Sequence, residues 1–496
     1  MIVMKFGGSS LESADAIARM AGVVRREHSR RPVVVVSALG KTTDRLIEFA
    51  DEARRGGRYT AGKCLDELQE HHFEIADRVV NPALMDSLDR SLQRSFRDLR
   101  VILFELADEG REFTEALQDE IYSFGERMSS EIVAAALQTA GIDSIHLDAR
   151  QLILTDHCHT HAKPLYWESC AKLRRAIVPL NANRVAVLGG FIGSTANGVT
   201  TTLGRGGSDL SASIVGAAIS ADEIQIWTDV DGMLTCDPRV LEGGYRLRAI
   251  SFEEAASMAL HGAKVLHPDT VTPAVRQRIP IVIRNSRRPE LEGTRVSEVA
   301  PVCSNPVKAI ALKSDLTVME FCPHRAKQRD ELAAAMSDMC ERHGIPPEFL
   351  SRTKDSIFLA LKRSARCQDL YFGLDGCVEV RLHPRAAIVT LVGEGIRSSL
   401  NTSARALSAL KSVPVIDVTD AQARMSVSLL VPRAEAEHCV EVLHREFFQQ
   451  IDPAVFAESA PLLPNPEVAD AQRMESRRYR AISAPVANHT PGFDCM

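Results

Sequence analysis

The first 290 or so residues alternate short apolar runs with longer stretches in which apolar residues recur every three or four positions. The four clearest runs, each closed by small or polar residues, are Ile2–Phe6, Val33–Ser37, Val185–Ile192 and Ile224–Thr228. Such runs are typical of strands, and the three-to-four spacing is typical of amphipathic helices. Because parallel strands need crossover connections, the alternation predicts an α/β fold whose mostly parallel sheet is sandwiched by helices.

The pattern changes near residue 300, where two units of similar size follow at 306–382 and 383–450. Their alternating runs predict two small α+β units and indicate a diverged repeat. The predicted strands are Ala309–Leu312, Leu316–Glu320, Ser356–Leu361, Ala387–Val392, Pro414–Val418 and Met425–Val431, and the predicted helices are Lys327–Glu341, Ser403–Leu410 and Ala434–Phe447. We therefore expect a large domain at 1–295, two small units, and a poorly ordered tail at 461–496, where Pro, Ala and Arg are frequent.

Composition narrows the class of protein. A hydrophobic fraction of 45% with 25% charged residues is ordinary for a globular chain, and a net charge of −6 gives no reason to expect nucleic-acid binding. No apolar run approaches the roughly 20 residues that span a bilayer, and the 11 cysteines form no CxxC pair. We expect a soluble, cytoplasmic protein with reduced thiols and no nucleic-acid or membrane partner.

Glycine-bearing turns follow four of the predicted strands. They are Lys5–Ser10, Ser37–Thr43, Gly189–Asp209 and Thr228–Arg239. Glycine lets the backbone approach a ligand closely and present N–H groups to phosphate oxygens. The first turn could also be an ordinary strand-to-helix connection, and it lacks the Walker A spacing. The third is the most specific, because its glycines and threonines surround Arg205, whose planar fork suits a carboxylate or a phosphate.

The third and fourth turns each allow a more detailed hypothesis. Ser208 is the predicted N-cap of the helix after the third turn. Free N–H groups at that helix start, beside Gly206 and Gly207, would form an anion site. In the fourth turn, Asp-Val-Asp-Gly at 229–232 is compatible with a hairpin turn or a weak divalent-metal loop, and its spacing does not match an EF-hand.

Taken together, these turns resemble the aspartate kinases of the amino-acid kinase superfamily. The motifs occur in the family's order: KFGGSS at 5–10, SFGERMSS at 123–130, TTTLGRGGSD at 200–209, WTDVDG at 227–232 and GAKVLHP at 262–268. GRGGSD and TDVDG are shared with other kinases of the superfamily, whereas the remaining motifs narrow the match. The resemblance covers residues 1–295 closely. It implies transfer of the ATP γ-phosphoryl group to the side-chain carboxylate of L-aspartate, giving 4-phospho-L-aspartate, the first step towards lysine, threonine and methionine.

The implied chemistry needs no general base. A carboxylate with an ordinary pKa near ~3.9 is already ionised at neutral pH, so the obstacle is the approach of one anion to another. We therefore expect catalysis by positioning and by positive charge around the transferring phosphoryl group. Mg²⁺ is implied as the counterion of ATP, held mostly by phosphates and water.

The resemblance implies a role for each matching position. Lys5 would neutralise the phosphoryl charge, with Asp209 and Arg205 completing the catalytic set. The implied substrate-binding set is Ser37, Thr43, Glu126, Arg205 and Ser208, in which Glu126 would hold the ammonium group and Arg205 the α-carboxylate. The implied nucleotide-binding set is Lys5, Gly7, Gly8, Ser9, Thr228, Asp229, Arg239, Lys264 and Val265. Leu234 stands where the family often has tyrosine.

Plainer explanations exist for several of these residues. Glu126 could simply favour the dipole of a helix that it heads, Lys264 could be a surface lysine, and Arg239 could be a turn residue. The tract of His157, His159 and His161 could converge on zinc, because alternate residues of a strand share a face. Histidines in a variable loop are the simpler interpretation.

The two C-terminal units resemble paired ACT domains, through which aspartate kinases commonly bind lysine or threonine and dimerise. The segments that would form the effector site carry Arg329, Asp330, Glu331, Arg352, Lys354 and Asp355. The resemblance implies a homodimer, and these bulky charges predict weak inhibition by lysine and threonine, or a different effector. The alternative functions are another amino-acid carboxylate kinase of the superfamily or a non-catalytic amino-acid sensor. An attached dehydrogenase is not expected, because no dinucleotide-binding fingerprint follows.

Overall fold

The computed structural model describes residues 1–108, 112–180, 183–263, 266–314, 316–323, 328–342, 347–353, 355–362, 378–383, 385–399, 401–419 and 425–458. The chain divides into a compact unit at Met1–Ala457 and a second unit at Glu458–Met496. The predicted tail at 461–496 lies outside the described residues, as do Lys264 and Val265. Within the described ranges, no helix has the length and apolar character needed to cross a membrane.

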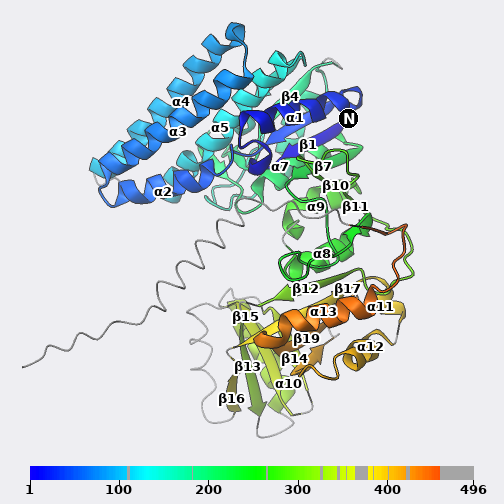
Figure 1. Ribbon diagram of the computed structural model, residues 1–496. Helices are drawn as coiled ribbons and strands as arrows, with labels where there is room; N and C mark the ends of the chain where they lie inside the picture. Colours follow the sequence, from blue (N-terminus) through cyan, green and yellow to red (C-terminus); the bar gives the residue numbers. More distant parts are fainter. Residues whose placement is uncertain are drawn as a thin grey trace, which may run out of the picture. The chain divides into compact units, whose positions relative to one another are not determined.

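An eight-stranded sheet forms the centre of the N-terminal region (Figure 1). Its strand order is β3-β4-β2-β1-β7-β10-β11-β9, and every neighbouring pair is parallel except β10 with β11. The strands are β1 (Ile2–Phe6), β2 (Pro32–Val36), β3 (Ser144–Leu147), β4 (Val185–Gly189), β7 (Glu223–Thr228), β9 (Ala249–Ser251), β10 (Ile281–Asn285) and β11 (Thr294–Ser297). The predicted mostly parallel sheet is confirmed.

Helices cover both faces of this sheet. Alternate strand residues point to opposite sides, so Val3 and Val35 join one apolar core while Met4 and Val34 join the other. The first core contains α6 (Tyr166–Ile177), α7 (Gly207–Ile219), α8 (Phe252–Leu260) and α9 (Pro268–Arg276). The second contains α1 (Ala14–Arg26), α2 (Thr42–Arg54), α3 (Arg58–Val79), α4 (Pro82–Asp108) and α5 (Glu115–Thr139). Strands buried on both faces explain the continuous apolar runs in the sequence.

The loops at the carboxyl edge of the sheet are joined around β1. The strand order reverses there, because β1 lies between β2 and β7, and open α/β sheets bind ligands outside the carboxyl ends at such a point. Backbone hydrogen bonds connect the loops: Gly7 N–H donates to the carbonyl of Trp227 at 3.0 Å, and Ser37 N–H donates to that of Phe6 at 3.0 Å. This edge is therefore the place to look for a site.

Two predictions about helix starts were wrong. Ser208 is not the N-cap of α7: the cap is Gly206, at φ 70°, because the chain turns sharply there and glycine adopts this conformation without strain. Ser208 lies inside the first turn of α7. Glu126 does not head a helix either, because α5 begins at Glu115 with Thr114 as its cap. The helix-dipole explanation for Glu126 therefore fails.

Smaller elements complete the large region. The predicted strand Val185–Ile192 ends at Gly189, and its last residue opens a hairpin of β5 (Ile192–Ser194) and β6 (Thr200–Thr202). β8 (Arg246–Leu247) pairs with β20 (Phe456–Ala457). Short 3₁₀ helices lie at η1 (Gly8–Ser10), η2 (His28–Arg30), η3 (Ala149–Gln151) and, in the C-terminal region, η5 (Arg433–Glu435).

Two four-stranded antiparallel sheets follow, so the predicted α+β units are confirmed. The sheet of order β14-β15-β13-β16 contains β13 (Leu316–Pro323), β14 (Phe349–Arg352), β15 (Ile357–Lys362) and β16 (Val378–His383), with α10 (Gln328–Arg342) between β13 and β14. The sheet of order β12-β17-β19-β18 contains β12 (Ala309–Lys313), β17 (Ala386–Val392), β18 (Asp417–Thr419) and β19 (Ser426–Pro432), with α11 (Gly395–Ser398), α12 (Thr402–Ala409) and α13 (Ala436–Phe447).

The two small sheets do not follow the expected division at 306–382 and 383–450. β12 precedes the first sheet in the chain, yet it pairs with β17 of the second, with Ala309 opposite Val392. The second sheet therefore takes its edge strand from upstream of the first, which local periodicity cannot reveal.

Candidate active site

An open pocket of about 440 Å³ lies at the carboxyl edge of the large sheet. The pocket brings together six of the residues that the sequence singles out: Lys5, Ser37, Thr43, Arg205, Ser208 and Asp209. They come from β1, the turn after β2, the start of α2, the turn before α7 and the first turn of α7. Residues so far apart in the chain share one pocket only because the parallel strands align their carboxyl ends.

Lys5 and Asp209 form an ion pair inside this pocket. Lys5 Nζ lies 2.8 Å from the Asp209 carboxylate, and the two side chains are 11% and 17% exposed. Lys5 is the one charged residue of β1, between the fully buried Met4 and Phe6. Its ammonium group is thus held at the pocket by a rigid strand, where it can meet an anionic ligand.

The first and second glycine turns touch each other. A Cβ atom at Gly8 would lie 2.5 Å from the carbonyl oxygen of Gly40, and Gly40 N–H donates to the Gly8 carbonyl at 3.1 Å. Any side chain at Gly8 would separate the turns after β1 and β2. Glycine at this position therefore allows the close approach of two loops. Gly7, Gly8 and Ser9 are half-buried and do not line the pocket.

Glu126 lies behind the pocket and is not part of its lining. Its residue is 3% exposed, and its Oε1 accepts the Ala38 N–H at 3.1 Å. Its Oε2 has no hydrogen-bond partner among the described residues. Burial raises the pKa of Glu126 to about 8, against the opposing effects of the Ala38 N–H and of Lys5. A cation brought to this free oxygen would favour the ionised carboxylate.

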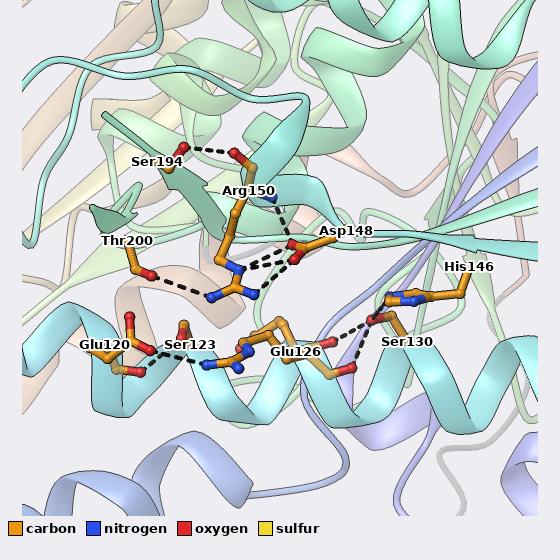
Figure 2. Close-up of polar contacts among 10 residues, drawn as sticks. Glu120, Ser123, Glu126, Ser130, His146, Asp148, Arg150, Ser194 and Thr200 are labelled. Carbon is orange, nitrogen blue, oxygen red and sulfur yellow. Dashed lines mark hydrogen bonds and ion pairs between the residues drawn. The ribbon is translucent and has the colours of Figure 1, made fainter. Parts of the chain in front are cut away.

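A polar network on α5 and β3 surrounds the backbone of Glu126 (Figure 2). The Ser130 hydroxyl donates to the Glu126 carbonyl at 2.7 Å and lies 3.0 Å from His146 Nε2. Burial lowers the pKa of His146. Nearby, Arg150 pairs with Asp148 at 2.8 Å, and both line a second cavity of about 150 Å³. The contact between Ser130 and His146 joins α5, and hence Glu126, to β3 of the sheet.

The turn into α7 packs directly on the loops after β2 and β4. The Ser37 hydroxyl donates to the Ser208 hydroxyl oxygen at 3.1 Å, and a Cβ atom at Gly190 would lie 2.8 Å from Ser208 Cα. Arg205 is exposed between two glycines of positive φ, Gly204 and Gly206, and it has no ion pair or hydrogen bond within the described ranges. Its guanidinium is therefore available to a carboxylate or a phosphate.

The residues expected to contact the nucleotide are brought together only in part. Thr228 ends β7 and its hydroxyl donates to the carboxylate of the exposed Asp229 at 3.2 Å, beside the strand end that Gly7 contacts. Arg239 is exposed, pairs with Asp237 at 2.6 Å and does not line the pocket. Lys264 and Val265 lie outside the described residues.

Asp231 in the fourth turn is engaged by protein partners. It is buried, lies 2.6 Å from the Arg288 guanidinium and accepts a hydrogen bond of 2.7 Å from Asn285 Nδ2. Both carboxylate oxygens are therefore used to hold the turn together, which favours the turn interpretation over a metal loop.

The histidine tract has partners of its own. His159 Nδ1 lies 2.8 Å from the Asp119 carboxylate, and His161 Nδ1 lies 2.8 Å from the Thr160 hydroxyl. His157 is exposed. In the part of the chain that the structure describes, no group of three or more His, Cys, Asp or Glu side chains is arranged to hold a metal ion.

Sequence reasoning did not assign Asp119, Thr160, His161 or Thr202 to the substrate site. The last three line the pocket, and Asp119 is a fully buried carboxylate behind them. One signal was available: Asp119 lies seven residues before Glu126, so both fall on the same face of a helix. Its partners could not be read from the sequence, because they lie on a loop and a strand that are distant in the chain.

The chain is similar to proteins of one kind along most of its length. The model of the amino acid kinase family matches residues 1–285, and that of an ACT domain matches residues 389–447. Chloroplastic aspartokinase 1 of Arabidopsis thaliana is 32% identical over 467 residues, which cover 91% of this chain and 80% of that protein. Lysine-sensitive aspartokinase 3 of Escherichia coli (strain K12) is 30% identical over 460 residues, which cover 90% and 99%.

The chain also superposes on solved structures of one of these relatives. Aspartokinase III of E. coli in complex with aspartate and ADP superposes with a TM-score of 0.76 at 29% identity, covering 90% of this chain and 100% of that one. The same enzyme in complex with lysine and aspartate gives a TM-score of 0.74.

Proposed function

The chain belongs to the amino acid kinase family and is an aspartokinase with a C-terminal ACT domain, and we propose that the pocket at Lys5 holds its reaction. In this proposal the ATP γ-phosphoryl group passes there to the side-chain carboxylate of L-aspartate. Two observations together carry the assignment: among the described residues, the Arg205 guanidinium on the pocket wall has no partner, and neither does the buried Oε2 of Glu126. An α-amino acid supplies the two charges that these groups lack.

The proposed grip on aspartate uses opposite charges at its two ends. Arg205 takes the α-carboxylate, for which its planar fork is suited. Glu126 takes the ammonium group through its free Oε2. The pKa of Glu126, at about 8 without a ligand, would fall when the ammonium group arrives, so binding near neutral pH should release a proton. Ser37, Thr43 and Ser208 complete the aspartate-binding set.

The proposed transfer needs charge stabilisation more than proton transfer. A side-chain oxygen of aspartate forms a bond to the γ-phosphorus while the bond from that phosphorus to the bridging oxygen breaks, and ADP leaves with the electron pair. Lys5 then pairs with the phosphoryl oxygens, and Asp209 holds Lys5 in place. The backbone N–H groups of Gly8 and Ser9 would cradle the phosphates, next to Gly7, whose own N–H donates to the Trp227 carbonyl at 3.0 Å. The further nucleotide contacts proposed are Thr228, Asp229, Arg239, Lys264 and Val265.

Mg²⁺ is the proposed counterion of ATP. Asp209 lines the pocket, and Asp229 is exposed directly after the end of β7, so these two carboxylates are the candidates to reach a metal that the phosphates carry. These residues fit a magnesium ion held mainly by phosphate oxygens and water. The ion would neutralise part of the triphosphate charge.

Assembly and compartment are proposals as well. We expect a homodimer through the ACT sheets, and β16 offers a sheet edge with Leu382 53% exposed. A cytoplasmic location is expected from the sequence, although the relatives from Arabidopsis are chloroplastic by name.

Product trapping tests the proposed function. The purified chain is incubated with ATP, Mg²⁺ and hydroxylamine, which converts an acyl phosphate to a hydroxamate, and with L-aspartate, L-glutamate or N-acetyl-L-glutamate. Saturable hydroxamate formation with aspartate is the expected result. Formation only with another acid would favour a different carboxylate kinase, and no product with any acid would favour a sensor.

A further inference from the structure

Asp119 is a fully buried carboxylate on α5 that contacts two other segments of the chain. Its oxygens accept the Thr160 N–H at 3.1 and 3.0 Å. Oδ1 also accepts the Thr202 hydroxyl, and Oδ2 lies 2.8 Å from His159 Nδ1. A carboxylate is an acceptor with several lone pairs, so it can satisfy all three donors at once.

Thr160 has a backbone conformation that threonine rarely adopts. Its φ is 66°, in the left-handed region, where a β-branched side chain is strained. Such strain persists only where the surroundings hold it, and it is common at functional sites. The Thr160 N–H donates to both oxygens of the Asp119 carboxylate, and these contacts hold the strained conformation. Thr160 also lines the pocket.

The held loop packs directly against the residue before Arg205. A Cβ atom at Gly204 would lie 3.2 Å from the His161 ring and 3.2 Å from the Thr160 carbonyl oxygen. Thr202, the other anchor of Asp119, ends β6 two residues before Gly204. Asp119 is therefore connected to Arg205 both through the loop at 159–161 and through β6.

We propose that Asp119 is a positioning residue for aspartate: it fixes the 159–161 loop and the end of β6, and through them it sets the place of Arg205. This proposal rests on the role proposed for Arg205 as the partner of the substrate α-carboxylate. A loosened Arg205 turn would leave the phosphate cradle after β1 untouched, because no described contact joins Asp119 to Gly7 or Gly8. The loss should therefore fall on aspartate binding and spare ATP.

Steady-state kinetics of Asp119→Ala, Asp119→Asn and Asp156→Asn test this role. Misplaced binding groups commonly cost about tenfold to a hundredfold, so Asp119→Ala should raise the KM for aspartate by about that factor with little change in the KM for ATP. Asp119→Asn keeps an acceptor oxygen and should recover most of the loss. Asp156 is the matched control: its carboxylate accepts the N–H groups of Cys158 and Lys163 at 3.1 and 2.9 Å, but no described contact joins it to Thr160 or Thr202.

A double-mutant cycle separates positioning from general damage. In an Arg205→Ala background, Asp119→Ala should add almost nothing to the KM for aspartate, because the two residues act on the same contact. Equal losses in the use of aspartate and ATP, or full additivity with Arg205→Ala, would overturn the proposal. So would an equal effect of Asp156→Asn.

Two safeguards keep the test decisive. If Asp119→Ala does not fold, as judged by circular dichroism, Thr202→Val replaces it, because valine keeps the volume and removes one donor. This variant should raise the KM for aspartate alone, and an unchanged KM would overturn the proposal. If the wild-type chain does not turn over aspartate, the proposed function fails. If it does and folded Asp119→Ala keeps its KM, only this inference fails.

Discussion

The carboxyl edge of the large sheet, where we propose the active site, and the junction of this sheet with the small sheets use charge in different ways. At the edge, Arg205 has no partner among the described residues and Glu126 has a free oxygen. At the junction, Lys308 Nζ lies 2.9 Å from the Glu254 carboxylate, with side chains 3% and 0% exposed. Glu254 also accepts the Glu394 N–H at 2.8 Å. The charges at the junction are thus fully paired, whereas the edge combines the paired Lys5 and Asp209 with two groups that lack a partner among the described residues and that a ligand would complete.

Breaking the junction should give the largest effect, on stability. Lys308→Met leaves Glu254 buried without its cation, and removing one partner of a buried ion pair costs about 3–5 kcal/mol. Thermal or urea unfolding should show this loss, while the kcat of the folded fraction stays near wild type. Glu254→Gln in the Lys308→Met background should recover part of the stability. A Lys308→Met variant as stable as wild type would show that this ion pair does not stabilise the fold.

Removing the charge of Lys5 should instead lower activity and leave stability nearly unchanged. Lys5→Met takes one fixed charge from the proposed phosphoryl site, which costs on the order of 10²-fold or more in kcat. Lys5 is held at an open pocket, so thermal stability should change little. Lys63→Met, at an exposed position of α3, is the matched control. A kcat near wild type, or a large fall in the unfolding temperature, would contradict the role of Lys5.

Removing either of the two proposed aspartate contacts should have the next largest effect, on the KM for aspartate. Arg205→Ala and Glu126→Ala should each raise the KM for aspartate by about tenfold to a hundredfold, because a lost charge-assisted contact costs about 1.5–3 kcal/mol. ATP binding should hardly change. If ATP affinity fell while the KM for aspartate held, the two residues would belong to the nucleotide site.

A pH dependence should be the smallest effect. Below its pKa of about 8, the ionised fraction of Glu126 falls about tenfold per pH unit. The KM for aspartate should therefore decrease several-fold as pH rises through neutrality to about 8, and Glu126→Gln should lose this dependence. A flat KM profile in the wild-type enzyme would argue against an ammonium contact at Glu126.

The raised pKa of Glu126 also predicts how the stability of the fold depends on pH. The folded state holds a proton on Glu126 that the unfolded state loses, between the ordinary pKa of 4.5 and about 8. Its contribution to stability is therefore complete below the ordinary pKa and is lost as pH rises towards about 8. Glu126→Gln should gain stability relative to wild type across this window, which unfolding at two pH values would measure.

Local patterns explain which parts were predictable. The strands β1, β2 and β7 are short apolar runs between polar turns, and the close approach at Gly8 leaves a visible Gly-Gly signature. β16 was missed although Val378–His383 alternates apolar with polar residues, which is the pattern of a half-buried strand. The pairing of β12 with β17 and the contacts of Asp119 depend on tertiary partners, so periodicity could not give them.

The segments expected to form the effector site bear on how the enzyme is regulated. Arg352 and Asp355 are exposed on either side of a turn in which the Thr353 hydroxyl oxygen accepts the Ser356 N–H at 3.0 Å. The side chains of Arg329, Asp330 and Glu331, and all of Lys354, lie outside the described residues. Bulky charges here would crowd a small zwitterion, so we expect weak inhibition by lysine and threonine, even though a relative from E. coli is lysine-sensitive by name.

The most direct test is the initial rate of ADP formation from ATP and L-aspartate, measured with and without lysine and threonine. The proposed active site, together with the charged residues in the segments expected to form the effector site, predicts saturable turnover of aspartate that neither amino acid suppresses at sub-millimolar concentration. Lack of turnover would contradict the proposed site. Half-inhibition by sub-millimolar lysine or threonine would show that the charged segments still form an effector pocket.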